Sequence, residues 1–385
     1  MVELKPELGS RRLFPHLQPA CYLCHAGVSP LSEPVQQAVA SLMGRFAGEG
    51  VGAVAEMLAM RQRLHQKLAS LLGCLPYDLA LTAGTSWGIL AVAQNFPWRA
   101  GDRIACVQGE FPTNVTPWRQ AAAQHGLELI YLQPDLGDLE AELKRGLRLL
   151  AVSAVSFQTG LRQPWQQLAQ LVHARGCQIF VDAIQAVGIV PFEVGELDYV
   201  AGGAHKWLMG VEGCGYLYVR PERQTELRHH WAGWLSHEDP ISFLFQGAGH
   251  LRYDRSLRPE PQRLEIGSSS HLSQVALEAS LNLLLELGVD QIFAHVTGYL
   301  DELAPQLDFL GWTSLRRPGA LSGSLCLKPG ADVRLADWVA ALDRRGVKVA
   351  SPDGVLRISP HWPNSLKEVP RVVEAFQEVQ RELDL

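Results

Sequence analysis

Blocks of apolar and polar residues alternate along most of this chain. From about residue 55, short apolar runs of the kind found in buried strands alternate with segments whose apolar positions recur every three or four residues, as in amphipathic helices. This alternation predicts an α/β fold in which a mainly parallel sheet is sandwiched by helices. The predicted strands span 79–82, 103–107, 127–132, 148–153 and 177–182, and the predicted helices span 56–72, 115–125 and 164–175, with another beginning near residue 85.

The pattern changes after residue 270, where long helical periodicities are followed by short strands and further helices. This order predicts a smaller α+β domain at the C-terminus. We therefore divide the chain into an N-terminal arm (1–30) that packs with the small domain, a large domain (31–270) and the small domain (271–385). The expected elements of the small domain are helices at 271–287, 290–307, 331–345 and 366–385 and strands near 322–328 and 355–359, after a loop at 253–263.

Composition is typical of a globular protein with a large core. Of the 385 residues, 47% are hydrophobic and 19% are charged. The formal net charge of −6 is spread along the chain, so we expect no basic face for nucleic acid. No apolar run approaches the ~20 residues of a membrane span, and the first residues lack the apolar stretch of a signal peptide. We expect a cytoplasmic protein without membrane contact.

The seven cysteines are scattered, and several lie in apolar runs. This favours buried thiols in a reducing compartment. Cys21 and Cys24 have the spacing of a redox motif or of half a metal site, but no second pair stands near them. We therefore interpret them as structural thiols and expect no metal.

The stretch from residue 179 to residue 220 carries the strongest chemical signal. Asp182 ends one apolar run, and His205 and Lys206 follow the next, with glycines around both. An acid at the carboxyl edge of a parallel sheet lies where open α/β folds bind ligands, and a lysine held there can lose its proton and attack a carbonyl. An amine for a Schiff base and an anion for a pyridinium nitrogen are what pyridoxal phosphate (PLP) requires. Without this context, Lys206 would be a solvated strand end and Asp182 a cap for the following turn.

A glycine followed by two hydroxyl residues, Gly84-Thr85-Ser86, joins a predicted strand to a predicted helix. Backbone N–H groups at a helix N-terminus, together with the hydroxyls, can bind a phosphate, although either hydroxyl could be a plain helix cap. The chain has neither a G-x-x-x-x-G-K-[ST] loop nor a G-x-G-x-x-G turn on a first βαβ unit. This argues against nucleotide-binding classes, including nicotinamide-dependent oxidoreductases.

Three motifs stand in order along most of the chain: residues 22–31, residues 182–188 with 205–208, and residues 356–361 with Asn364. Together they resemble the opening turn, the central motif and the C-terminal motif of the class V aminotransferase family of fold-type I PLP enzymes. That family includes cysteine desulfurases, kynureninase and isopenicillin N epimerase-like proteins. The resemblance implies the fold-type I architecture, a PLP cofactor and a small amino-acid substrate.

The resemblance also implies a role for each matching residue. Lys206 would form the Schiff base with the cofactor, Asp182 would pair with the pyridinium nitrogen, and Gln185 would hydrogen-bond the phenolic oxygen. Phe111 stands where desulfurases stack a histidine on the ring. An aromatic ring stacks well but cannot relay protons, so Lys206 would carry most of the acid–base chemistry.

The resemblance assigns Thr85, Ser86 and His205 to the cofactor's phosphate. The alternative for His205, and for Gln185 at the phenolic oxygen, is that each is an ordinary polar residue at the end of a strand. Ser268 matches a segment that reaches the phosphate of the partner subunit, which implies a homodimer with shared active sites.

On the substrate side, Arg357 would clamp the α-carboxylate through a bidentate pair. A structural ion pair with an acidic residue is the alternative, since an arginine within a strand is costly to bury unpaired. His25 and Gln158 are further candidates for lining the substrate pocket.

Three departures from the family pattern narrow the reaction. Desulfurases carry a cysteine on a loop before the matching arginine, but the corresponding loop, 350–354, has none, and Cys326 lies in an apolar strand. Persulfide-forming desulfuration is therefore not expected. Phe111 replaces the stacking histidine, and Gly203 replaces a hydroxyl residue that often serves the phosphate.

We therefore favour an aminotransferase or a β-lyase of the C–S lyase type, in which Lys206 abstracts the Cα proton of a small amino acid. An amino-acid epimerase of the isopenicillin N epimerase type and a non-catalytic PLP-binding regulatory protein are the alternatives. The sequence does not decide among these outcomes.

Overall fold

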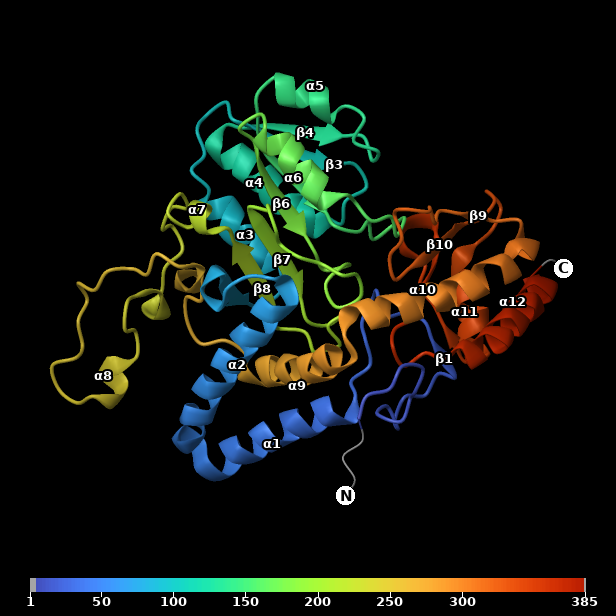
Figure 1. Cartoon of the computed structure of the whole chain (residues 1–385), viewed down its shortest axis with the longest axis horizontal. Helices are drawn as coiled ribbons and strands as arrows, with labels where there is room; N and C mark the ends of the chain where they lie inside the picture. The colour runs from blue at the N-terminus through green and yellow to red at the C-terminus, as the bar shows by residue number, and fades with distance from the viewer. Residues whose placement is uncertain (1–4, 384–385) are drawn as a thin grey trace.

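A seven-stranded mixed sheet forms the centre of the large domain in the computed structural model, which describes residues 5–383 (Figure 1). Five neighbouring strands, from β7 to β4, run parallel, while β8 pairs antiparallel with both β7 and β2. This confirms the predicted fold class. In spatial order the strands are β2 (Leu79–Thr82), β8 (Gly215–Val219), β7 (Tyr199–Gly203), β6 (Gln178–Asp182), β5 (Leu147–Ser153), β3 (Arg103–Val107) and β4 (Glu128–Leu132).

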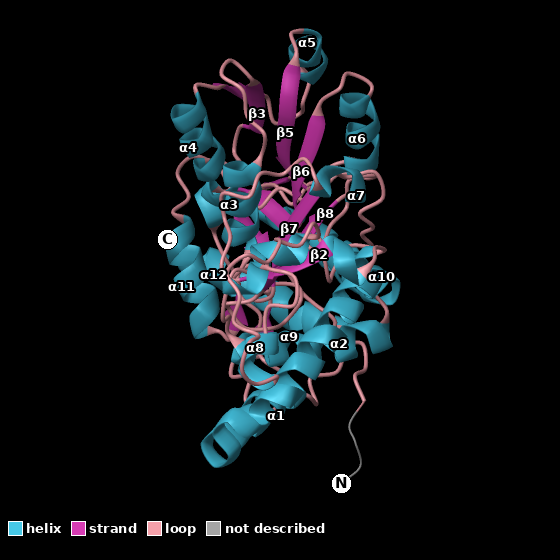
Figure 2. Cartoon of the chain, turned by 90° about the vertical axis from the view of Figure 1, so that its left-hand side faces the viewer, coloured by secondary structure: helices cyan, strands magenta, loops and turns pink. Residues whose placement is uncertain are grey.

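Helices cover both faces of this sheet, as the alternation of segments predicts (Figure 2). Successive side chains of a strand point to opposite faces: Leu150 in β5 belongs to one apolar core and Leu149 to the other. The two cores differ in the helices that close them. One is closed by α3 (Thr85–Asn95) and α4 (Thr116–His125), and the other by α2 (Val54–Leu72), α5 (Leu139–Lys144) and α6 (Trp165–His173).

The C-terminal part forms a separate antiparallel sheet with the strand order β12-β10-β9. The N-terminal arm reaches this part, because Cys21 and Tyr22 of β1 pair in parallel with Val347 and Lys348 of β11. The assignment of domain boundaries stays a prediction. The remaining elements are α1 (Glu33–Glu49), α7 (Pro221–Gln224), α8 (Ser242–Phe245), α9 (His271–Leu287), α10 (Val289–Gln306), β9 (Thr313–Ser314), β10 (Leu325–Lys328), α11 (Leu335–Arg344), β12 (Leu356–Ile358) and α12 (Val369–Leu383).

The structure adds elements that the sequence pattern missed. Helix α1 was not predicted, and it packs along α9 (Figure 1). The final helix begins at Val369 after a short 3-10 turn at Leu366–Glu368, and the predicted end at 384–385 lies outside the described residues. Within residues 5–383, no single helix has the length and apolarity to cross a membrane; α9 and α10 meet those criteria only as a pair bent by 78°.

Gly88 sets how closely α3 approaches the sheet. A Cβ atom at Gly88 would lie 2.8 Å from the Cβ atom of Ala201 in β7, closer than two carbon atoms can pack. The start of α3 and the end of β7 lie close together for this reason, and both lead into the site described below.

The Gly88→Ala variant tests this packing. Alanine favours a helix by about 1 kcal/mol over glycine, but the clash with Ala201 is expected to outweigh that gain and to lower the free energy of unfolding by about 1–3 kcal/mol. Thermal and urea unfolding measure the change. The matched control is Gly298→Ala in α10, where an added Cβ meets nothing within 4 Å and a small stabilisation is expected. A Gly88→Ala protein as stable as the wild type would contradict the account.

Candidate active site

Asp182 ends β6 at the carboxyl edge of the sheet, as predicted. Its side chain is only 1% exposed, and its Oδ1 atom accepts a hydrogen bond of 3.0 Å from the Ile184 N–H. Burial raises the pKa of Asp182 to about 6, while the Ile184 hydrogen bond and the charge of Lys206 act in the opposite direction. Asp182 therefore does cap the following turn, but with one oxygen only. The second oxygen remains for a cationic ligand.

Lys206 follows β7, the strand next to β6. Burial lowers its pKa to about 8; the charge of Asp182 opposes this shift and the charge of Arg357 adds to it. The Lys206 Nζ atom lies 5.5 Å from the centroid of the Phe111 ring. The amine thus stands among an acid, an arginine and an aromatic ring, and it loses its proton more readily than a solvated lysine. The alternative of a solvated strand-end residue is wrong.

The two loops that carry Asp182 and Lys206 are locked together. Gly188 has a φ of +99°, and a Cβ there would lie 2.6 Å from the Trp207 carbonyl oxygen, so only glycine fits. Gln185 accepts a hydrogen bond of 2.8 Å from Trp207 Nε1 and donates one of 3.0 Å to the Ala26 carbonyl. The predicted bond from Gln185 to a phenolic oxygen stays a prediction, and just one N–H of the amide is left to make it.

Thr85, Gly203 and His205 converge at the start of α3. Gly84 occupies the N-cap position of this helix, and no side chain makes a capping hydrogen bond there. The alternative that Thr85 or Ser86 caps the helix is therefore wrong. A Cβ at Gly203 would lie 3.1 Å from Thr85 Oγ1 and 3.7 Å from His205 Cε1. A side chain at position 203 would therefore contact Thr85 and His205 directly.

The hydroxyl groups of this corner differ in their partners. Thr85 Oγ1 is buried and, within residues 5–383, has no hydrogen-bond partner. Ser86 is exposed and its hydroxyl bonds the Thr113 hydroxyl. Burial and the charge of Lys206 lower the pKa of His205. A buried, unpaired hydroxyl beside the first N–H groups of a helix suits an anionic group such as a phosphate.

Arg357 lies in β12, opposite Cys326 of β10, and is only 6% exposed. Its Nη1 atom donates a hydrogen bond of 2.9 Å to the Phe157 carbonyl, and its buried Nε atom has no partner within residues 5–383. No ion pair with an acidic residue of that range satisfies it, so the structural alternative fails. Burial lowers the pKa of Arg357, and the unsatisfied donor suits a carboxylate ligand.

Three further residues were predicted from the sequence: His25, Gln158 and Ser268. His25 is buried, with its Nδ1 atom 2.8 Å from the Ser29 hydroxyl and its ring 5.3 Å from that of His361. Gln158 is half-buried and donates a hydrogen bond of 2.6 Å to Asp353 Oδ2. Ser268 is exposed just before α9. The proposed roles of these three residues stay predictions.

Sequence analysis missed Glu110. This side chain follows β3 at the same sheet edge, and its Oε1 atom accepts a hydrogen bond of 2.6 Å from the Ser153 N–H. Burial raises its pKa to about 7, the bonds from Ser153 oppose the shift, and the charge of Asp182 adds to it. Glu110 therefore holds or releases a proton near neutral pH, close to Asp182. An acid three residues after an apolar strand, a weaker form of the signal used for Asp182, could have found it.

These groups fit PLP and an amino acid. A buried amine with a lowered pKa suits an aldehyde, a buried carboxylate suits a ring nitrogen that carries a proton, and the corner at Thr85 suits a phosphate. The free donor of Arg357 suits the carboxylate of a substrate. Within residues 5–383, no group of three or more His, Cys, Asp or Glu side chains has the arrangement of a metal site.

Comparison with known proteins agrees with this geometry. The chain is 26% identical to the uncharacterized aminotransferase YcbU of Bacillus subtilis, over 94% of the chain and 95% of that protein. It is 28% identical to isopenicillin N epimerase of Streptomyces clavuligerus, over 90% and 92%. It shares the fold of the cystine C–S lyase C-DES, solved with its reaction product cysteine persulfide, with a TM-score of 0.82, 20% identity and coverage of 92% and 96%.

The family described as aminotransferase class-V matches residues 21–361, which are most of the chain and include every candidate site residue described above. The chain belongs to the class V aminotransferase family and is a PLP-dependent enzyme.

Proposed function

We propose that the enzyme acts on a small amino acid by transamination or by β-elimination of the C–S lyase type, with Lys206 as the base that removes the Cα proton. The observation that carries the proposal is the Lys206 amine, whose pKa burial lowers to about 8. The charge of Asp182 opposes this shift and the charge of Arg357 adds to it. When bound, PLP supplies an electron-accepting ring to the substrate amine.

Each residue has a separate task. Arg357 binds the α-carboxylate and thereby orients the Cα–H bond toward the Lys206 amine. Asp182 keeps a proton on the ring nitrogen, since its negative charge in a buried place favours a cationic partner. Lys206 takes the Cα proton and returns it at another atom. Because Phe111 beside the amine has no titratable group, Lys206 serves as both base and acid.

The cysteines near the substrate side do not support persulfide-forming desulfuration. The loop 350–354 before Arg357 contains no cysteine. Cys326 is buried and burial raises its pKa to about 12, and burial also raises the pKa of Cys24. A thiol with a raised pKa is a poor nucleophile at neutral pH. Carbon–sulfur bond cleavage by β-elimination needs no protein thiol and remains part of the proposal.

Epimerisation is the second candidate, because isopenicillin N epimerase of Streptomyces clavuligerus is 28% identical to the chain. It requires a proton donor on the face of Cα opposite to Lys206. A regulatory protein that keeps the cofactor without turnover is the third, and the buried, unpaired groups of the site count against it.

We also propose a homodimer in which Ser268 reaches the partner's site. The segment around α8 stands away from the body of the molecule (Figure 1). It exposes large apolar side chains, with Phe245 58% and Tyr253 89% exposed. Surfaces of this kind mark interaction sites.

Product analysis tests the reaction. The enzyme, assayed with a panel of small amino acids, is expected to form a keto acid, with ammonia in β-elimination and with transfer of the amino group in transamination. Lys206→Ala is expected to abolish all products, whereas Lys328→Ala, at an exposed lysine that ends β10, is expected to retain them. A D-amino acid without keto acid would point to the epimerase, and no product from any amino acid would refute the proposal.

Arg357→Gln has two expected effects. Loss of the charged clamp is expected to raise KM by about 10–100-fold, the value of a hydrogen bond to a charged group. The reactive form of Lys206 is neutral, so capture of PLP by the apoenzyme rises with pH through about 8. The Arg357 charge lowers the Lys206 pKa, so its removal moves this midpoint to higher pH. The exposed Arg334→Gln variant is the control, and an unchanged KM and midpoint would contradict the placement.

Sedimentation analysis tests the dimer. The wild type is expected to sediment as a dimer, and Ser268→Ala is expected to remain a dimer while binding PLP more weakly, because one phosphate contact is lost. Ser314→Ala, an exposed serine of β9, is the control. A monomeric holoenzyme with full activity would overturn the shared site.

A further inference from the structure

A cavity of about 510 Å³ opens at the edge of the sheet opposite the active site. Gln178, the first residue of β6, lines it, whereas Asp182 at the other end of β6 belongs to the active site. They are four residue steps apart along the strand, or about 13 Å at ~3.3 Å per residue. The cavity is therefore a separate site. Four arginines line it: Arg99, Arg148, Arg223 and Arg228.

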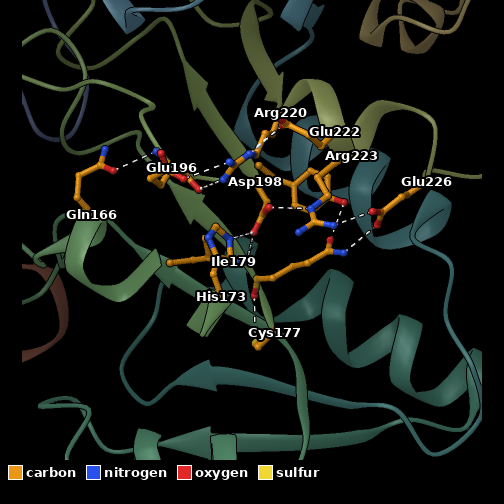
Figure 3. A network of polar contacts seen from close by, with 12 residues as sticks. Gln166, His173, Cys177, Ile179, Glu196, Asp198, Arg220, Glu222, Arg223 and Glu226 are labelled. Atoms are coloured by element: carbon orange, nitrogen blue, oxygen red, sulfur yellow. Dashed lines mark hydrogen bonds and ion pairs between the residues drawn. The ribbon is translucent and has the colours of Figure 1, made fainter. Parts of the chain in front are cut away.

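One of these arginines is neutralised by a fixed network (Figure 3). Arg223 donates hydrogen bonds of 2.8 Å to Asp198 and of 2.6 Å to Glu226. The fully buried Asp198 carboxylate also lies 2.7 Å from His173 Nε2 and accepts a hydrogen bond of 2.8 Å from the Ile179 N–H. This network ties α7, α6 and β6 together and forms a rigid wall of the cavity, in which Arg223 has no spare charge.

The other three guanidinium groups lack such compensation. Arg148 lies 3.9 Å from Asp102, beyond hydrogen-bond distance, and its guanidinium stands 5.2 Å from the centroid of the Phe96 ring. Arg228 donates a hydrogen bond of 3.2 Å to the Trp98 carbonyl, which carries no net charge. The Arg99 side chain has no ion-pair partner within residues 5–383. Within residues 5–383, the only carboxylate paired with any of these three cations is Asp102, 3.9 Å from Arg148. Glu226, the acidic residue of the cavity lining, is already paired with Arg223.

Cations that gather around one cavity repel one another unless an anion lies between them. Guanidinium groups present planar pairs of donors that match phosphate and carboxylate oxygens. Here they come from three segments: Arg99 precedes β3, Arg148 belongs to β5 and Arg228 follows α7. Three converging donors match the three free oxygens of a phosphate ester better than the two of a carboxylate. The volume lies within the ~300–1,000 Å³ of small-molecule sites and exceeds the needs of inorganic phosphate.

We propose that this cavity binds a small molecule that carries a phosphate group, held by Arg99, Arg148 and Arg228 against the wall formed by His173 and Arg223. The site is independent of the reaction at Lys206. It also stands whether or not the proposed function is correct, because none of its residues touches the active site.

Calorimetric titration of the holoenzyme tests the site. The PLP phosphate already fills the active-site corner in this form. The Arg357→Gln holoenzyme is titrated in parallel, so that binding at the substrate-carboxylate site is separated from binding in the second cavity. The probes are inorganic phosphate, pyrophosphate and adenosine monophosphate, each up to about 10 mM, a range that detects weak binding, with malate as a dicarboxylate of similar charge. Pyrophosphate or adenosine monophosphate is expected to bind more tightly than inorganic phosphate and malate.

Variants assign the site to these arginines. Arg99 and Arg228 are exposed, so Arg99→Ala with Arg228→Ala is expected to leave folding intact and to weaken binding about tenfold or more. Arg99→Ala alone serves as a milder variant if thermal unfolding shows that the double variant is destabilised. Arg175→Ala, an exposed arginine after α6 outside the cavity lining, is expected to bind as the wild type does.

Three results would overturn the proposal. They are the absence of binding by all three phosphate probes, binding that both the single and the double variant leave unchanged, and tighter binding of malate than of any phosphate probe. The last result would assign the cavity to a dicarboxylate.

Discussion

The structure depends on keeping an amine and a carboxylate out of water at the ends of two neighbouring parallel strands. Burial disfavours the charged form of each group, so it lowers the pKa of Lys206 to about 8 and raises that of Asp182 to about 6. Their mutual attraction opposes both shifts and is not strong enough to cancel them. The result is an amine that is partly neutral near physiological pH and a carboxylate poised for a cationic partner.

The surrounding structure holds this pair in place at some conformational cost. The close approach at Gly188, where a Cβ would lie 2.6 Å from the Trp207 carbonyl oxygen, fixes the two loops relative to each other. Met209, whose N–H bonds the Lys206 carbonyl, has a φ of +52°, a region that side-chain-bearing residues seldom adopt. Such strain near a reactive group is tolerated where the surrounding packing determines the backbone. The lysine is therefore positioned before any ligand arrives.

Sequence reasoning succeeded where one local rule decides the outcome. Apolar runs predicted β6 and the ends of neighbouring strands. Because open α/β folds bind ligands at the carboxyl edge of the sheet, the end of β6 then located Asp182. Sequence reasoning missed α1, a helix that packs along α9, because that packing joins segments more than 200 residues apart in the chain. It also gave no indication that β8 runs antiparallel to its neighbours, because strand direction depends on contacts far apart in the chain. The engagement of Gln185 with Trp207 and Ala26, and the buried state of Glu110, likewise arise from tertiary packing.

The most direct measurement is peptide mass spectrometry of the holoenzyme after reduction with borohydride, which fixes the cofactor to the lysine that carries it. If the amine with the lowered pKa is the one that reacts, the phosphopyridoxyl mass is found on the peptide containing Lys206 and on no other. Labelling of a solvent-exposed lysine such as Lys328 instead, or no labelled peptide, would contradict the account.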